Sequence, residues 1–260
     1  MKRNDLFPAR KINGLWFAIL FFLPTSSVHH TAQKNGAALI IHFRAYVHGE
    51  PLRLNKKYQN PFGEIFEISR FRFYAGKIEG IHKDTARKMN ISSYRLIDFS
   101  DSSSTYVSLP ATTGTCNGIQ FLLGVDSTDQ NRGAQTGALD PIKGMFWTWN
   151  TGYVTFKIEG YSPVSGEPAH MIAYHIGGYH YPFSTVWKIK LDATNEEPFT
   201  ITANNKVTVE VSIELDQLFD GTHPLHIKEI SSCTTPGDLA RKISENFIGS
   251  FTGLTLIPVP

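Results

Sequence analysis

Two tryptophans that stand one residue apart are the first feature of this chain that could do chemistry. Trp147 and Trp149 lie in the stretch GMFWTWNTGYVTFKIEG (144–160), and the whole chain holds only 4 tryptophans. An intact indole offers no free lone pair to a metal ion, whereas oxidative opening of the ring leaves an amine and a carbonyl that can both serve as ligands. Aromatic packing in a core or at an interface is the other interpretation of the pair.

Histidines supply the second set of candidate residues, because imidazole is the commonest metal ligand in proteins. His42 and His48 are six residues apart on one extended segment, so a strand that continued that far would point both to one face. His175 lies in AHMIAYHIGGYHYP (169–182), where it shares a strand face with Met171. No pair has the spacing of a tight metal site, so surface or hydrogen-bonded structural roles stay open for each histidine.

Carboxylates and thiols give two weaker predictions. Asp126, Asp129 and Asp140 flank a polar loop and could bind calcium, although their spacing is not that of an EF-hand, and turn capping is the alternative. Cys116 and Cys233 are an even pair, which is compatible with one disulfide in an oxidising compartment. Two unpaired buried thiols are the alternative to that disulfide.

The N-terminal segment predicts export. A basic start is followed by the apolar run GLWFAILFFLP (14–24), which is too short to span a membrane and typical of a signal peptide. We therefore predict a signal peptide over 1–32, a single mature domain over 33–260, and a periplasmic or secreted location without a membrane span. Removal of the segment takes a net charge of +3 with it, so the formal charge of +2 becomes about −1. No basic patch or motif indicates nucleic-acid binding.

The elements that must position these residues are mostly strands. Period-2 alternation is clearest in GYVTFKIEG (152–160) and KVTVEVSIEL (206–215), and apolar stretches predict further strands over 37–47, 64–81, 94–99, 105–110, 119–125 and 187–191. FTITA before Asn204-Asn205 predicts a hairpin with the strand that follows. Thr235-Pro236 predicts the start of a helix whose face carries Leu239, Ile243 and Phe247. The fold class is therefore all-β, an antiparallel β-sandwich-like domain with a short C-terminal helix.

Three blocks of the sequence resemble a known family. GVDS (124–127), GAQTGALDPIKGMFWTWNTGYVTFKIEG (133–160) and YHIGGY (174–179) are similar to segments of the MbnP-like family, the copper-binding periplasmic proteins of methanobactin cassettes. The order and spacing of the blocks extend the resemblance over roughly residues 37–250. It implies an exported β-sandwich-like protein that binds copper. A low-coordinate site of imidazoles in an apolar setting would suit Cu(I).

The resemblance also implies roles for particular residues. In related copper proteins a tryptophan is oxidised to kynurenine by a di-haem enzyme of the cytochrome c peroxidase type and then joins histidines as a ligand. Carried onto this chain, Trp147 and Trp149 are the candidates for modification, and His175 occupies the family's histidine position. His42 and His48 lie in the family's first-strand region and are the remaining candidate ligands. An outer-membrane receptor is a further expected partner.

The sequence therefore predicts a copper-binding protein for storage, delivery or uptake, not an enzyme, since no G-x-S-x-G, H-E-x-x-H or P-loop motif is present. The alternative function is a β-sandwich interaction or adhesion module that binds a protein or glycan through its aromatic patch.

Overall fold

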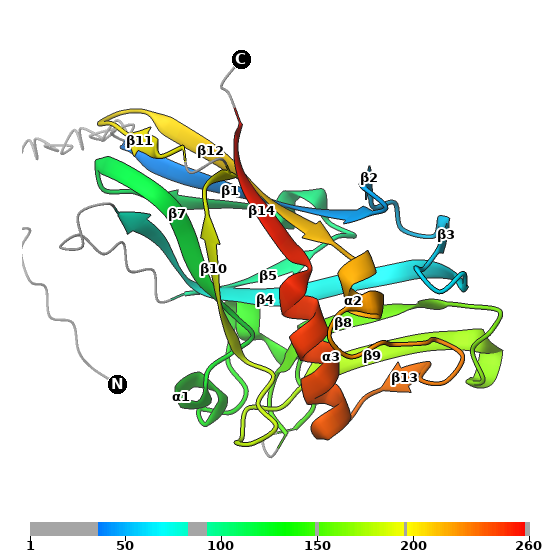
Figure 1. Ribbon diagram of the computed structural model, residues 1–260. Coiled ribbons are helices and arrows are strands. Elements are labelled where there is room, and N and C mark those ends of the chain that lie inside the picture. Colours follow the sequence, from blue (N-terminus) through cyan, green and yellow to red (C-terminus); the bar gives the residue numbers. More distant parts are fainter. Residues whose placement is uncertain (1–35, 83–92, 149–150, 195–196, 258–260) are drawn as a thin grey trace, which may run out of the picture. The chain divides into compact units, whose positions relative to one another are not determined.

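Two β-sheets dominate the computed structural model, which describes residues 36–82, 93–148, 151–194 and 197–257 (Figure 1). The smaller sheet has five strands in the described part of the chain: β1 (Ala38–Val47), β2 (Glu50–Pro51), β6 (Tyr106–Pro110), β12 (Lys206–Glu214) and β14 (Phe251–Ile257). The larger has nine: β3 (Lys57–Gln59), β4 (Ile65–His82), β5 (Tyr94–Asp98), β7 (Gly114–Leu123), β8 (Val154–Tyr161), β9 (Met171–Gly177), β10 (Trp187–Asp192), β11 (Phe199–Ile201) and β13 (Ser232–Cys233). The all-β sandwich-like class is confirmed.

The long strand β4 organises the larger sheet. Its first half pairs with β8 between Glu67 and Phe73, and its second half pairs with β7 between Ala75 and His82. The half that pairs with β7 contains a β-bulge between Gly76 and Glu79, where Lys77 adopts a left-handed conformation with φ 49°. β4 thus changes its neighbour between Phe73 and Ala75, and the bulge bends the half that pairs with β7.

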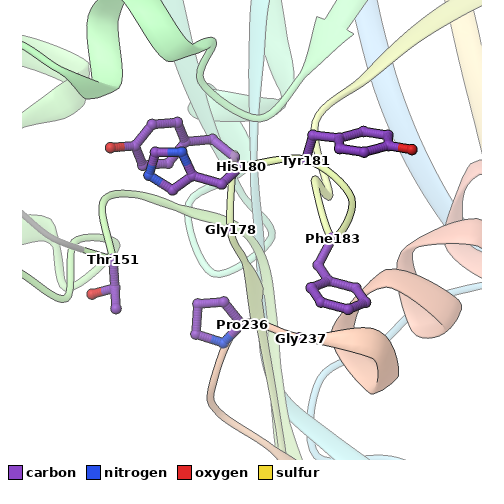
Figure 2. Close-up of a pocket in the computed structure, with 8 residues that line it drawn as sticks. Thr151, Gly178, His180, Tyr181, Phe183, Pro236 and Gly237 are labelled. Atoms are coloured by element: carbon purple, nitrogen blue, oxygen red, sulfur yellow. The ribbon is translucent and has the colours of Figure 1, made fainter.

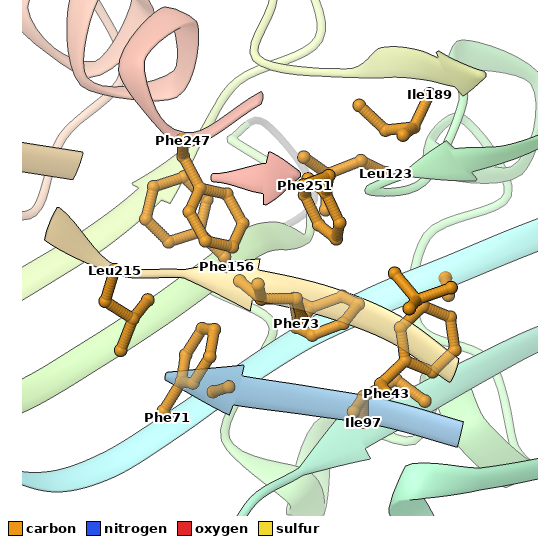
Figure 3. Close-up of a cluster of buried hydrophobic side chains, with 14 of the residues drawn as sticks. Phe43, Phe71, Phe73, Ile97, Leu123, Phe156, Ile189, Leu215, Phe247 and Phe251 are labelled. Carbon is orange, nitrogen blue, oxygen red and sulfur yellow. The ribbon is translucent and has the colours of Figure 1, made fainter. Parts of the chain in front are cut away.

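Aromatic side chains fill the space between the sheets (Figure 3). Phe43 of β1 packs edge-on against Phe73 of β4 and Phe121 of β7, with ring centroids 5.4 and 5.6 Å apart. β1 alternates strictly between buried and half-buried residues, which is the period expected for a strand with one face on a core. The opposite faces of the two sheets therefore remain available for other contacts.

A second, smaller hydrophobic cluster lies on the outer face of the larger sheet. Its buried members are Tyr74, Tyr94, Val125, Leu139, Met145, Tyr153 and Val154. Most of its cover comes from the predicted polar loop, which contains the short helices α1 (Ser127–Gln130), η2 (Gly137–Leu139) and η3 (Pro141–Lys143). This loop segment ends in the tryptophan stretch.

Near the C-terminal end the helix α3 (Asp238–Gly249) packs beside α2 (Asp216–Asp220), and α3 leads directly into β14. α3 begins at Asp238 after Gly237, later than Thr235-Pro236 predicts, and its buried face carries Ala240, Ile243 and Phe247 while Leu239 is exposed. Other short helices in the described ranges include η1 (Ser102–Thr105) and η4 (Pro168–His170). No helix in the described ranges is long and apolar enough to cross a membrane.

Two pairings differ from the sequence prediction. The predicted hairpin around Asn204-Asn205 is wrong, because β11 pairs with β7 of the larger sheet whereas β12 pairs with β1 and β14 of the smaller one. The turn instead carries the chain from one sheet to the other. In addition β1 and β12 are parallel, within sheets that are otherwise mainly antiparallel. Local patterning identifies a strand but not its partner. The predicted signal peptide lies outside the described residues.

A candidate metal site beside the tryptophan hairpin

The tryptophan stretch forms a tight hairpin that leads into β8. Val154 donates a backbone hydrogen bond to Met145 at 2.9 Å, and Trp147 donates one to Gly152 at 3.0 Å. Buried Gln130 fixes the far side of this hairpin, because its Oε1 accepts from the Tyr153 N–H at 2.7 Å. The hairpin is thus held both by its own backbone and by the loop that covers the second cluster.

The indole of Trp147 lies against β9. A Cβ atom added at Gly177 would stand only 2.8 Å from Cζ3 of Trp147, so the indole occupies the space that any other side chain would fill. Trp147 is half-buried and packs against the second cluster. Trp149 lies outside the described residues, so its predicted role stays a prediction.

His175 sits two residues before Gly177 and therefore on the same face of β9. Its Nε2 lies 2.8 Å from Oε1 of Glu159 on the neighbouring strand β8. Donation from Nε2 to a carboxylate fixes the neutral tautomer and leaves the Nδ1 lone pair free to bind a metal. No described residue bonds Nδ1. Among the described candidates, His175 and Trp147 are the two that the fold brings to one surface.

Glu159 connects His175 to a cationic environment. Arg70 forms an ion pair with Glu159 at 2.7 Å, and Lys157 lies 3.8 Å away. The hydrogen bond from His175 is the main cause that lowers the pKa of Glu159 to about 2, despite partial burial that acts in the other direction. The carboxylate therefore stays ionised and orients the imidazole over the whole physiological pH range.

His42 and His48 do not join this surface. His42 lies on the outer face of the smaller sheet, where its ring stacks on Tyr106 at 3.9 Å, and burial lowers the pKa of His42. His48 contacts Gln59 of β3, and Gln59 lies opposite Ile65 at the start of β4. His175 lies opposite Lys157 of β8, and Lys157 lies opposite Arg72, seven residues after Ile65 on β4. At about 3.3 Å per strand residue this alone separates the two histidines by more than about 20 Å. The even spacing of the two histidines does not predict a shared site, because β1 ends at Val47.

Comparisons with known proteins give the family. The family model for MbnP matches residues 36–235. This chain belongs to the MbnP family. The solved structure of MbnP from Methylosinus trichosporium has a similar fold, with a TM-score of 0.53, 14% sequence identity, and coverage of 76% of this chain and 83% of that chain. The comparison with curated proteins gives no match. The tryptophan hairpin and His175 both lie inside the part of the chain that the MbnP model covers.

A pocket of about 200 Å³ adjoins this MbnP-family surface (Figure 2). It is lined by Thr151 of the hairpin, by the segment that follows β9 and by the residues before α3 (Thr151, Gly178, Tyr179, His180, Tyr181, Phe183, Pro236 and Gly237). Figure 2 shows His180 at its rim, opposite Pro236. Sequence reasoning gave His180 no role, and only its closeness to the Gly177-Gly178 pair could have drawn attention to it.

The predicted disulfide is not formed, because Cys116 and Cys233 are both free and buried. On the neighbouring strand β7, Cys116 is the register partner of His82 at the end of β4. Cys233 on β13 lies opposite Tyr174 of β9, which lies opposite Ile158 of β8, which in turn lies opposite Phe71 of β4. Phe71 and His82 are eleven positions apart along β4, on the order of 30 Å at strand rise, whereas a disulfide needs a Cα separation of about 4–7 Å. Burial raises the pKa of the Cys116 thiol to about 11, so this thiol is unreactive.

The three loop aspartates have local partners. Asp126 caps α1 and pairs with Lys77, Asp140 caps η3, and Asp129 accepts from Tyr94 at 3.0 Å. No group of three or more His, Cys, Asp or Glu side chains in the described ranges is placed to hold a metal ion. Capping and pairing account for these aspartates, and calcium binding at the loop stays an untested prediction.

Proposed function

We propose that this member of the MbnP family is an exported copper-binding protein that stores, delivers or takes up copper and performs no turnover chemistry of its own. The observation that carries the proposal is His175, whose Nε2 is held by Glu159 while Nδ1 is free, beside the half-buried indole of Trp147. A histidine oriented by a carboxylate is the usual arrangement of an imidazole ligand. Imidazole nitrogen is a ligand that suits copper.

The rest of the ligand set comes from the hairpin and the adjoining pocket. Oxidation of Trp147 or Trp149 to kynurenine, by a di-haem partner of the cytochrome c peroxidase type, supplies an amine and a carbonyl next to His175. His180 is a further candidate ligand, because it lines the pocket to which Thr151 of the hairpin also contributes and lies five residues after His175. We expect export to the periplasm or the medium, where an outer-membrane receptor is a further candidate partner.

Copper titration of the chain that begins at residue 33 tests the proposal. The wild type should bind Cu(I) stoichiometrically in competition with a chromophoric chelator, and His175→Ala should lose that binding. His223→Ala is the matched control, because His223 has the same kind of carboxylate partner, Glu245 at 2.7 Å, but lies away from the hairpin. Absence of copper binding, or equal binding by His175→Ala, would contradict the proposal.

Intact mass tests the modification separately. Conversion of tryptophan to kynurenine exchanges one carbon atom for one oxygen atom, so co-expression with the di-haem partner should raise the mass by that difference. Tryptic peptides would then assign the change to Trp147 or Trp149. An unchanged mass would remove kynurenine from the ligand set but would leave copper binding through imidazoles to be judged by the titration.

The exposed aromatics around the pocket favour a second candidate function. Tyr181 is 95% exposed and Phe183 is 42% exposed, on a segment whose base is closed by the hydrogen bond from Thr185 N to Gly178 O at 2.9 Å. Rigid exposed aromatics are common anchors of interfaces. If a protein or glycan binds here, the Tyr181→Ala variant should lose that binding and should still bind copper.

A further inference from the structure

The loop between β9 and β10 is closed at its base. This loop, residues 178–186, carries His180 and is called the His180 loop below. Thr185 donates its N–H to the carbonyl oxygen of Gly178 at 2.9 Å, and its hydroxyl donates to the same oxygen at 3.1 Å. The hydroxyl oxygens of Thr185 and Thr155 of β8 lie 2.8 Å apart. The two ends of the loop are therefore fixed to each other and to the larger sheet.

The middle of the His180 loop is held by one arginine of α3. Nη1 of Arg241 donates to the carbonyl oxygens of Pro182 and Ser184, at 3.2 and 3.3 Å. These carbonyls belong to the second and the fourth residue after His180. Because the acceptors are backbone atoms, the arginine fixes the path of the chain itself and not only the position of a side chain.

The guanidinium of Arg241 is itself held in place by two further contacts. It lies over the ring of Trp187 at 4.3 Å, and its Nε pairs with Oε1 of Glu245 at 2.7 Å. Trp187 is fixed in turn, because its Nε1 donates to Oγ of Ser244 at 2.9 Å. A planar guanidinium can stack on an aromatic ring and donate from several nitrogens at once, whereas a lysine ammonium cannot reproduce this set of contacts.

The imidazole of His180 is not engaged by the rest of the fold. No described residue forms a hydrogen bond with either of its nitrogens, and its ring stacks on Tyr179 with centroids 3.9 Å apart. Tyr179 donates its hydroxyl to Asn131 at 3.2 Å and leaves no room for a side chain at Gly152 of the tryptophan hairpin. Both His180 and Thr151 of the hairpin line the pocket (Figure 2). The structure therefore holds a histidine with free nitrogens beside the hairpin.

We propose that Arg241 is a positioning residue for copper binding, because it holds the His180 loop in the path that brings His180 to the tryptophan hairpin as a ligand beside His175. This role rests on the copper function proposed above. If the loop were free to take other paths, the apparent copper affinity would fall with the fraction of molecules in which His180 faces the hairpin. A loop that is already ordered avoids this loss and the cost of ordering on binding.

Arg241 contributes little to the packing of α3, so its effect on the loop can be measured separately. The buried residues of the helix lie on another face (Ala240, Ile243, Ser244, Asn246 and Phe247). The side chains of Arg241 and Glu245 are both 30% exposed, and exposed ion pairs of this i,i+4 type add little to stability. We therefore expect Arg241→Lys to fold and to melt close to the wild-type temperature.

Hydrogen exchange of the metal-free protein tests the positioning directly. Arg241→Lys keeps the positive charge but loses the stacking and the paired contacts with the two carbonyls. Mass spectrometry should then show faster amide exchange in 178–186, by about tenfold, the change expected when one net hydrogen bond of the loop is lost. Lys242→Gln is the matched control, because Lys242 pairs with Asp238 at 2.7 Å within α3 and its loss should leave exchange in the loop unchanged.

Copper titration tests the consequence for binding. In competition with a chromophoric chelator, Arg241→Lys should bind Cu(I) about tenfold more weakly than the wild type, and Lys242→Gln should bind like the wild type. In a His180→Ala background, Arg241→Lys should cause no further weakening, because the ligand that the loop positions is already absent. A general structural role of Arg241 would weaken binding equally in both backgrounds.

The outcomes separate this role from the copper function itself. If His175→Ala loses copper while His180→Ala or Arg241→Lys binds like the wild type, the copper function stands and the positioning role is refuted. Unchanged exchange of residues 178–186 in Arg241→Lys would also refute it, as would equal weakening in both backgrounds. Absence of copper binding by the wild type would refute the copper function and the positioning role together.

Discussion

Substitution of Gly177 by alanine should act almost entirely through Trp147. The backbone of Gly177 is outside the left-handed region, so alanine meets no conformational penalty there, but its Cβ would lie 2.8 Å from Cζ3 of Trp147 and 3.1 Å from the Tyr153 carbonyl oxygen. Ordinary contact begins at 3.4 Å. The indole must therefore retreat by about 0.6 Å, or the strand must shift. Overpacking of this size costs about 1–3 kcal/mol.

We expect Gly177→Ala to lower the free energy of unfolding by about 1–2 kcal/mol, at the lower end of that range because Trp147 is only half-buried. Chemical denaturation followed by circular dichroism measures the loss, and indole fluorescence reports the displaced ring. Gly166→Ala is the control, because a Cβ at Gly166 meets nothing within 4 Å.

A double-mutant cycle isolates the contact. In a Trp147→Leu background the six-membered ring that carries Cζ3 is absent, so the loss caused by Gly177→Ala should fall to within about 0.5 kcal/mol of zero. A loss that is the same in both backgrounds would refute the reasoning, since it would place the strain at the Tyr153 carbonyl and not at the indole. Copper binding by Gly177→Ala should weaken in parallel if Trp147 belongs to the site.

Three further outcomes follow from other parts of the molecule. Because the pKa of Glu159 is lowered to about 2, its stabilising contribution is present above pH 4.5 and lost as pH falls from 4.5 toward 2; acid titration of Glu159→Gln should lack that loss. Gln130→Ala leaves the buried Tyr153 N–H without its acceptor and should reduce the free energy of unfolding by about 2 kcal/mol in urea denaturation, whereas an effect below about 0.5 kcal/mol would contradict the role given to this side chain. Cys116 and Cys233 should both react with a thiol reagent once the exported protein is denatured without reductant, and a reductant should leave the melting temperature unchanged.

Period-2 patterning predicts most of the fold because burial on one face of a strand is a local property. The runs at 37–47, 64–81 and 206–215 all form strands within a residue or two of the predicted bounds. Partner choice is not local. The pattern of Phe199–Ile201 and Lys206–Glu214 predicts two arms of a hairpin, yet the two strands join different sheets, while their apolar residues enter the same core. Nothing in the four-residue turn between the two strands reveals that the chain changes sheets there.

The individual residues of the candidate site can be predicted from the sequence, but the contacts between them cannot. Trp147 and His175 could be singled out by residue type and family resemblance, and the fold places them on one surface. Their connection through Gly177, and the role of Glu159, depend on the register of β8 against β9, which composition does not encode. The prediction that His42 and His48 share one strand face is wrong for a different reason: β1 ends at Val47, and His48 lies in the turn that follows, which the spacing of the two histidines does not reveal.

The position of the site follows from an asymmetry between the two sheets. The larger sheet carries a second apolar cluster on its outer face, and burial of that cluster requires a covering segment that the smaller sheet does not need. That segment ends in the Trp147 hairpin, so the tryptophan is fixed by the same packing that hides Met145 and Tyr153. β9 lies at the margin of the cover, where His175 is fixed by Glu159 and still partly exposed. A metal site needs ligands that are held rigidly and can still be reached, and the margin of a covered sheet face provides both conditions.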